Sequence, residues 1–124
     1  MPPVRIVLVE DNEVFRDALE LLLGMRDDVQ IVASVGDGAA AVSAAIEYRP
    51  DVVLMDYRLP SLDGIQATAQ VVSAVPDVAV VALTASADAA EREALVEAGA
   101  VSCLTKDQEL EEIVSAIVSA ASVA

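Results

Sequence analysis

The stretch Pro50-Asp-Val-Val-Leu-Met-Asp-Tyr-Arg-Leu-Pro60 is a short apolar run that ends at an aspartate and is followed by a loop closed by a proline. A short run of this kind between polar residues is typical of a strand that is buried on both faces. Other runs rich in Val, Ile and Leu share this form. We therefore expect strands over residues 4–9, 30–35, 51–55, 78–83 and 101–104.

Segments with helical character separate these runs. One apolar stripe with a 3.6-residue period is formed by Phe15, Ala18, Leu19, Leu22 and Leu23, and a second by Leu110, Ile113, Val114, Ile117, Val118 and Ala121. The segments 38–48, 64–74 and 88–98 are rich in Ala, which favours helix, and Gly99 is placed to end the last of them. The alternation predicts one α/β domain over residues 1–124, with a parallel sheet and helices on both faces.

The composition excludes several classes of function. The 124 residues include seven basic and 21 acidic ones, for a net charge of −14, so we expect no direct nucleic acid contact by this segment. No apolar run approaches the ~18 residues that span a membrane, and the first residues lack a secretory signal, so we expect a cytoplasmic protein without membrane contact. The absence of His and the single Cys exclude His-based triads and cysteine metal clusters.

Polar side chains follow four of the five expected strands. Because parallel strands present their carboxyl ends at one edge of the sheet, these side chains should meet there. Each has an ordinary structural role of its own: Asp11 or Asn12 could cap a helix, Asp56 could form a turn, and the sole lysine could be a solvated charge. Their joint occurrence favours a functional site, formed by Glu10, Asp11, Asp56, Thr84 and Lys106.

This set of residue types suits phosphoryl transfer to a carboxylate. Clustered carboxylates attract a hard divalent cation such as Mg²⁺, which neutralises charge on phosphoryl oxygens. A lysine ammonium supplies a second positive charge, and a carboxylate nucleophile can form a covalent acyl phosphate. The hydroxyl of Thr84 could then donate a hydrogen bond to the new phosphoryl oxygens.

In these features the chain resembles the receiver domains of two-component response regulators. The resemblance spans nearly the whole chain and rests on the stretches 6–12, 50–60, 62–65, 82–85, 98–100 and 104–107, which read IVLVEDN, PDVVLMDYRLP, LDGI, ALTA, AGA and LTKD. It implies a doubly wound, flavodoxin-like (βα)5 fold with strand order 2-1-3-4-5. It also implies a signalling switch that is not a turnover enzyme.

The resemblance assigns roles to individual residues. It implies that Asp56 is the phosphoacceptor and that Mg²⁺ is bound by Asp11, Asp56, the carbonyl of Arg58 and, through water, Glu10. The remaining roles fall on three residues past the later strands: Thr84 as the switch hydroxyl, Ala85 as a small residue that leaves the acyl phosphate accessible, and Lys106 as the phosphate contact. Gly64 resembles the glycine that opens the third helix.

The resemblance also implies partners and an output. A sensor histidine kinase would supply the phosphoryl group, and the loops 57–63 and 84–90 and the fourth helix would respond to it. The segments 10–16, 55–60 and 104–107 are similar to receivers of the nitrate-response (LuxR-type) class, which precede a helix-turn-helix DNA-binding domain. We therefore expect transcriptional output through a later domain and homodimerisation on activation, with Leu21, Met25 and the last helix as candidate contacts.

Two positions depart from the family pattern. Cys103, a possible part of the signalling surface, lies where the family often has a Tyr or Phe that rotates inward on activation. The usual coupling of the switch hydroxyl to that aromatic is therefore not expected here, and the default interpretation of Cys103 is a thiol packed as a small hydrophobe. Asp107 follows the lysine where many receivers have proline, which predicts a different arrangement of that loop.

Three rival interpretations remain open from the residues. A haloacid-dehalogenase-type phosphatase also uses a carboxylate nucleophile at a strand end, but it needs a second Asp where this chain has Arg58. A pseudo-receiver would be an interaction module that is never phosphorylated, and Cys103 keeps that interpretation open. A flavin-binding relative of the fold is disfavoured, because the aromatics are limited to Phe15, Tyr48 and Tyr57 and no phosphate loop is apparent.

Overall fold

Five strands alternate with five helices along the chain in a computed structural model that describes residues 2–85 and 88–123. Ser86 and Ala87, which belong to the 84–90 loop, lie outside the described residues. The strands are β1 (Val4–Val9), β2 (Val29–Val35), β3 (Val52–Asp56), β4 (Ala79–Thr84) and β5 (Ser102–Thr105). The helices are α1 (Glu13–Gly24), α2 (Gly38–Tyr48), α3 (Gly64–Ala74), α4 (Ala89–Ala98) and α5 (Leu110–Val123).

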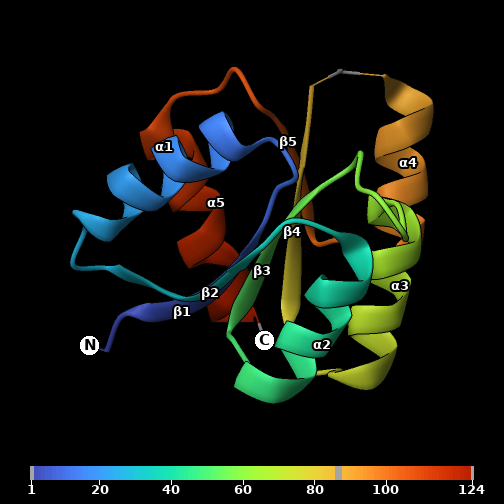
Figure 1. The fold of residues 1–124 in the computed structure, drawn as a ribbon, viewed down its shortest axis with the longest axis horizontal. Helices are drawn as coiled ribbons and strands as arrows, with labels where there is room; N and C mark the ends of the chain where they lie inside the picture. The colour runs from blue at the N-terminus through green and yellow to red at the C-terminus, as the bar shows by residue number, and fades with distance from the viewer. Residues whose placement is uncertain (1, 86–87, 124) are drawn as a thin grey trace.

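The strands form one parallel sheet in the order β2-β1-β3-β4-β5, which confirms the predicted topology. Figure 1 shows the sheet as the middle layer, with α1 and α5 on one face and α2, α3 and α4 on the other. The strand order reverses between β1 and β3, because β2 lies outside β1 while the later strands extend the sheet in the opposite direction. In folds of this kind, ligands bind beyond the strand ends at that reversal.

Alternate residues of the central strands supply two separate cores. On one face, Val7, Val53 and Val80 pack with the small residues of α2 and α3. On the other face, Ile6, Leu54 and Val81 pack with α1 and with the buried stripe of α5. Burial on both faces explains why the sequences of β1, β3 and β4 are almost continuously apolar.

The strand ends differ slightly from the sequence-based expectation. Asp56 and Thr84 were expected just after their strands, but each is the last residue of its strand. The reason is that both still pair with a neighbouring strand, Asp56 with Leu83 and Thr84 with Thr105. The two side chains are therefore fixed by the sheet itself, which leaves them less freedom than loop residues would have.

The expected apolar stripe of α1 was too broad. Phe15, Leu19 and Leu23 face the core, but Ala18 and Leu22 are exposed. Helix α1 packs against β2, at one edge of the sheet, and against α5. A narrow row of residues spaced i, i+4 and i+8 is enough to make these contacts. In α5, Val118 is likewise exposed, while Ile113, Val114 and Ile117 are buried as expected.

Four helices begin at a side chain that caps their first turn. Asn12 accepts a hydrogen bond from the backbone of Phe15, which decides between the two candidate caps of α1 in favour of Asn12. The other three caps are Asp37, Asp63 and Asp88. Helix α4 ends at Gly99, whose φ of +121° agrees with the expected positive-φ terminator.

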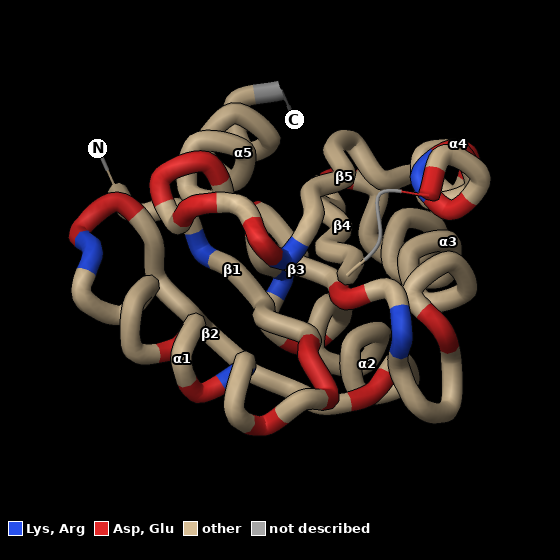
Figure 2. Tube along the Cα trace, turned by 90° about the horizontal axis from the view of Figure 1, so that it is seen from above, with Lys and Arg blue, Asp and Glu red and all other residues tan. Residues whose placement is uncertain are grey.

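Acidic residues are spread over the helices and the loops between them, with few basic residues among them, as Figure 2 shows. Among the described helices, none is both long enough and apolar enough to cross a membrane. Two carboxylates, those of Glu10 and Asp56, are instead buried at the strand ends.

Candidate functional site

Carboxylates from two adjacent strands meet at the carboxyl edge of the sheet. Glu10 and Asp11 follow β1, and Asp56 ends β3, the neighbouring strand. One carboxylate oxygen from each of the three lies within 4.8 Å of the others. Glu10 is 1% exposed and Asp56 is 3% exposed, whereas Asp11 is open to solvent. Two buried acids and one exposed acid therefore form a cluster that is accessible from one side.

Lys106 joins the two buried acids. Its ammonium lies 2.5 Å from Oε1 of Glu10 and 3.1 Å from Oδ2 of Asp56. The backbone N–H of Lys106 donates to the carbonyl of Thr84 at 2.8 Å, so the main chain at the end of β5 is tied to the end of β4. The predicted approach of the sole lysine to the phosphoacceptor candidate is what the structure shows.

The ring of Phe15 also contacts this ammonium. Nζ of Lys106 lies 4.9 Å from the centroid of the Phe15 ring, within the range of a cation–π contact. Phe15 was expected only as a core residue of α1, and this second contact was missed. An aromatic residue five positions past an acid is not a recognisable signal, because the contact depends on the rotation of α1 and on the reach of the Lys106 side chain.

The pKa values in the cluster are displaced in opposite directions. Burial, followed by the neighbouring Glu10 carboxylate, raises the pKa of Asp56 to about 7, against the opposing influence of Lys106. Burial also opposes ionisation of Glu10, but hydrogen bonds with Asp56 and Lys106 outweigh it and lower the pKa of Glu10. Desolvation likewise works against the Lys106 ammonium, yet its hydrogen bond with Glu10 and the two acids leave the pKa of Lys106 raised.

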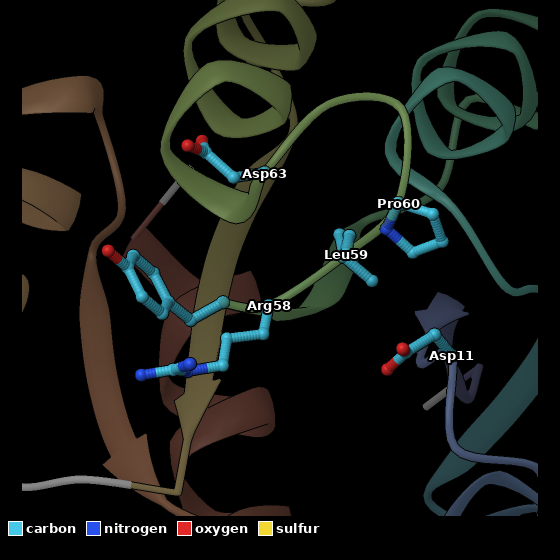
Figure 3. Close-up of a pocket in the computed structure, with 6 residues that line it drawn as sticks. Asp11, Arg58, Leu59, Pro60 and Asp63 are labelled. Atoms are coloured by element: carbon cyan, nitrogen blue, oxygen red, sulfur yellow. The ribbon is translucent and has the colours of Figure 1, made fainter.

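An open pocket lies beside the exposed acid. It is lined by Asp11, by residues 57–60 of the loop after β3, and by Asp63. Figure 3 shows the Asp11 carboxylate facing this loop, with the Arg58 side chain directed away from Asp11. Arg58 is exposed and lines this pocket, while its guanidinium points away from Asp11.

Gly64 brings the first turn of α3 close to the end of β3. Its N–H donates to the carbonyl of Tyr57 at 2.7 Å, and a Cβ built on it would lie 2.5 Å from the carbonyl oxygen of Asp56. Any other residue would collide with the backbone that carries Asp56. The close approach gives a physical reason for the glycine that the sequence singled out.

The two residues at the end of β4 differ in exposure. Thr84 is buried, and its hydroxyl lies 3.4 Å from Oε2 of Glu91 on α4. Ala85, which follows it, is exposed. The structure therefore places the Thr84 hydroxyl one strand away from Asp56 and in contact with α4, a partner that the sequence did not reveal.

Cys103 is half-buried on β5 and packs against the core on the α4 side of the sheet. Its backbone carbonyl accepts a 2.8 Å hydrogen bond from the guanidinium of Arg92, while the Nε of Arg92 is buried without a hydrogen-bond partner. Burial raises the pKa of the thiol, which fits the interpretation of Cys103 as a packed small hydrophobe.

Asp107 orders the loop after Lys106 through its side chain. The hydroxyl of Thr105 donates to its carboxylate at 2.5 Å, and the backbone N–H of Thr105 donates to the side chain of Gln108. Side-chain hydrogen bonds thus shape the loop at the position where the family often has proline.

Comparison with known proteins identifies the family. The family model of the response regulator receiver domain matches residues 6–118. The transcriptional regulatory protein LiaR of Bacillus subtilis is 35% identical over 114 residues, which cover 92% of this chain and 54% of LiaR. The chain spans about half the length of the curated relatives it matches.

Solved structures agree with this result. The signal receiver domain of the putative response regulator NarL from Mycobacterium tuberculosis superimposes with a TM-score of 0.94 at 34% identity and covers 98% of both chains. The receiver domain of the sensor histidine kinase PA1611 from Pseudomonas aeruginosa, solved with a magnesium ion coordinated in its active site cleft, matches with a TM-score of 0.81 at 34% identity, covering 97% of this chain and 98% of that one. The chain therefore belongs to the response regulator receiver domain family.

Proposed function

We propose that this receiver domain accepts a phosphoryl group on Asp56 from a sensor histidine kinase and changes its surface in response. The observation that carries the proposal is the placement of Lys106, whose ammonium contacts both Glu10 and Asp56 at the carboxyl edge of the sheet. A buried acid beside a fixed ammonium and an open acidic pocket provides a nucleophile, a positive charge for the phosphoryl oxygens, and a path of access.

The chemistry of the donor set fits Mg²⁺. Glu10, Asp11 and Asp56 offer hard oxygen ligands close to one another, and the exposure of Asp11 leaves room for water. We assign Asp11, Asp56 and the carbonyl of Arg58 as ligands, with Glu10 acting through water. When bound, Mg²⁺ would neutralise the carboxylates and the charge on the phosphoryl oxygens.

Each residue of the site then has a separate role in the transfer. In its ionised form, an oxygen of Asp56 attacks phosphorus, the bond from phosphorus to the donor histidine breaks, and its electron pair returns to the imidazole. Lys106 stays beside the new acyl phosphate and contacts one of its oxygens. The Thr84 hydroxyl exchanges its contact with Glu91 for another phosphoryl oxygen, while Ala85 leaves the group accessible.

The proposed output extends beyond this segment. Because relatives such as LiaR are transcriptional regulators of about twice this length, we propose that the full protein controls transcription from the cytoplasm through a C-terminal helix-turn-helix domain. The receiver domain itself would signal and not turn over a substrate. Its acidic charge supports an output without direct nucleic acid contact by this segment.

Homodimerisation on activation is part of the same proposal. Leu21 of α1 and Met25, just past the end of that helix, are 67% and 76% exposed, so both are available for contact with a second copy. Sedimentation with Mg²⁺ and beryllofluoride, a phosphoryl mimic, should show a shift toward dimer that Leu21→Ser reduces. A monomer under all conditions would contradict this part of the proposal.

The acceptor is tested by incubating the domain with acetyl phosphate and Mg²⁺ and then measuring the mass of the intact protein by mass spectrometry. The wild-type domain should gain one phosphoryl group, and Asp56→Asn should gain none. Asp51→Asn is the matched control, because Asp51 directly precedes the same strand at its opposite end and should leave labelling unchanged. Labelling of Asp56→Asn at the wild-type level would overturn the assignment.

The rival interpretations make different predictions in the same assay. Given a phosphate ester in place of acetyl phosphate, a phosphatase of the dehalogenase type would show steady turnover far beyond one equivalent. A pseudo-receiver would gain no mass, and its amide NMR spectrum would not change on addition of Mg²⁺ and beryllofluoride. A flavin-binding relative would bind FMN.

A further inference from the structure

We propose that Arg16 is a positioning residue for the metal-binding turn, acting by clamping the backbone carbonyl of Glu10, and that Gly36 provides the space this clamp requires. The inference deepens the proposed function, since it rests on Glu10 and Asp11 serving a Mg²⁺ site. It concerns two residues that the sequence did not indicate as part of the site.

The first observation is the set of contacts that fixes Glu10. Its N–H donates to the carbonyl of Val35 at 3.0 Å, and its own carbonyl accepts a 2.8 Å hydrogen bond from Nη1 of Arg16. Its carboxylate is held by the backbone N–H of Asn12 at 3.1 Å and by Lys106. Arg16 therefore restrains the one backbone group of Glu10 that the sheet does not.

This restraint extends to Asp11, the next residue along the chain. The carbonyl of Glu10 belongs to the peptide plane that leads into Asp11, and a peptide unit is rigid, so fixing the carbonyl fixes the N–H and Cα of Asp11 as well. Asp11 is exposed, and its carboxylate faces the pocket. The direction in which Asp11 points thus depends on the peptide plane between Glu10 and Asp11. Arg16, in the first turn of α1, fixes this plane by its hydrogen bond to the Glu10 carbonyl.

The second observation is the space beside Gly36, just past the end of β2. A Cβ built on Gly36 would lie 2.8 Å from Nη1 of Arg16 and 3.8 Å from the carbonyl oxygen of Glu10. The glycine is not required by its backbone, because Gly99 is the glycine with a positive φ among the residues the structure describes. What the position requires is room for the guanidinium.

The collision at Gly36 involves the tip of a flexible side chain and not backbone. Gly36→Ala should therefore fold normally while displacing Arg16 from the Glu10 carbonyl. Gly36→Ala breaks the hydrogen bond but leaves every charge in place, whereas Arg16→Met removes the charge and the hydrogen bond together. Comparing the two variants therefore separates the effect of the contact from the effect of the charge.

The sign of the effect separates positioning from plain electrostatics. A guanidinium near an acidic cluster repels a divalent cation, so a purely electrostatic role predicts that Arg16→Met binds Mg²⁺ more tightly. Positioning predicts the opposite, because outer contacts that orient ligands typically contribute about tenfold or more to metal affinity.

The experiment is an NMR titration of Mg²⁺ into the wild-type domain, Arg16→Met, Gly36→Ala and the double variant. Both single variants should bind Mg²⁺ about tenfold more weakly than wild type, and the double variant should be no weaker than Arg16→Met, because both changes break one contact. Arg5→Met is the matched control: Arg5 also donates to backbone carbonyls, those of Tyr48 and Arg49, but at the opposite end of the sheet. Its affinity for Mg²⁺ should not change.

A second readout needs no metal. In the metal-free protein, the amide signal of Asp11 should shift in Arg16→Met and Gly36→Ala, since it reports the hydrogen bond on the preceding carbonyl, and should not shift in Arg5→Met. Wild-type affinity or tighter binding in Arg16→Met, or an unmoved Asp11 amide, would overturn the clamp. Failure of the wild-type domain itself to bind Mg²⁺ would instead overturn the proposed function.

Discussion

Two regions at the carboxyl edge of the sheet are held together differently. At the ends of β1 and β3, the buried Glu10 and Asp56 are joined by Lys106. At the end of β4, the hydroxyl of Thr84 lies 3.4 Å from the carboxylate of Glu91 on α4. The first region is tied together by short contacts between opposite charges. In the second, α4 has one fully buried apolar residue, Leu95, and meets β5 through the hydrogen bond from Arg92 to Cys103. We therefore expect the carboxylate side, formed by Glu10, Asp56 and Lys106, to stay in place, and the α4 side, formed by α4 and the end of β4, to move more easily.

The largest effect should come from removing the ammonium of the carboxylate side. Lys106→Met would leave Glu10 and Asp56 buried without their cation, at a cost of about 3 kcal/mol in the free energy of unfolding at pH 8 in EDTA. The loss should shrink at pH 5, where Asp56 is protonated and the repulsion ends. Urea unfolding at the two pH values measures both.

Arg26→Met is the control for this prediction. It also removes a cation with two acidic partners, Asp28 and Glu111, but this ion-pair group lies at the surface. Its effect should be much smaller and nearly the same at both pH values. A loss in Lys106→Met that is equal at pH 5 and pH 8 would contradict the buried-charge explanation.

The second prediction has the opposite sign. The pKa of Asp56 is raised to about 7 in the folded domain, against an ordinary value near 4 in the unfolded chain. Between these values the folded state keeps a proton that the unfolded state has lost, so the stability due to this group falls as pH rises. Asp56→Asn should therefore be more stable than wild type at pH 8, by on the order of 2 kcal/mol, and close to it at pH 4.

Unfolding free energies from pH 4 to pH 8, measured in EDTA, test the sign. An Asp56→Asn domain that is less stable than wild type at pH 8 would contradict this prediction. It would show that the attraction of Lys106 fully offsets the burial of the Asp56 charge and its repulsion by Glu10.

The third prediction concerns the link between α4 and β5. Arg92→Met removes the stabilising hydrogen bond to the Cys103 carbonyl, but it also removes the destabilising buried Nε that has no partner. The free energy of unfolding should therefore fall by only about 1 kcal/mol. Amide hydrogen exchange should become faster in α4 and β5 and remain unchanged in β1 and β3. Faster exchange throughout the sheet would contradict a local role.

The smallest effect is expected at Glu91. The contact with Thr84 is long for a hydrogen bond, so Glu91→Ala should change stability by less than about 0.5 kcal/mol while still speeding exchange in α4. Glu93→Ala is the matched control, since Glu93 is an exposed acid on the same helix and gives the same change in helix propensity. Equal exchange rates in the two variants would show that the contact does not restrain α4.

The sequence predicted the strands well because burial on both faces leaves a strong signal in runs of Val, Ile and Leu. It also brought Glu10, Asp56 and Lys106 to one edge, since residues at the carboxyl ends of parallel strands must meet. It missed Arg16, Glu91 and Arg92. Their contacts depend on helix rotation and on the reach of long side chains, which no spacing rule encodes. The same reason explains why Leu22 was placed in the core stripe and is exposed.

Cys103 gives the region around β5 a native chemical reporter. It is the only sulfhydryl in the chain, so an alkylating reagent can modify one place alone, with no need to introduce or delete a cysteine. The thiolate is the reactive form, and burial keeps the pKa of this thiol raised, so labelling is slow while α4 covers β5. We therefore expect the rate of alkylation to rise when α4 moves away from β5, so that this rate would report the motion proposed for signalling.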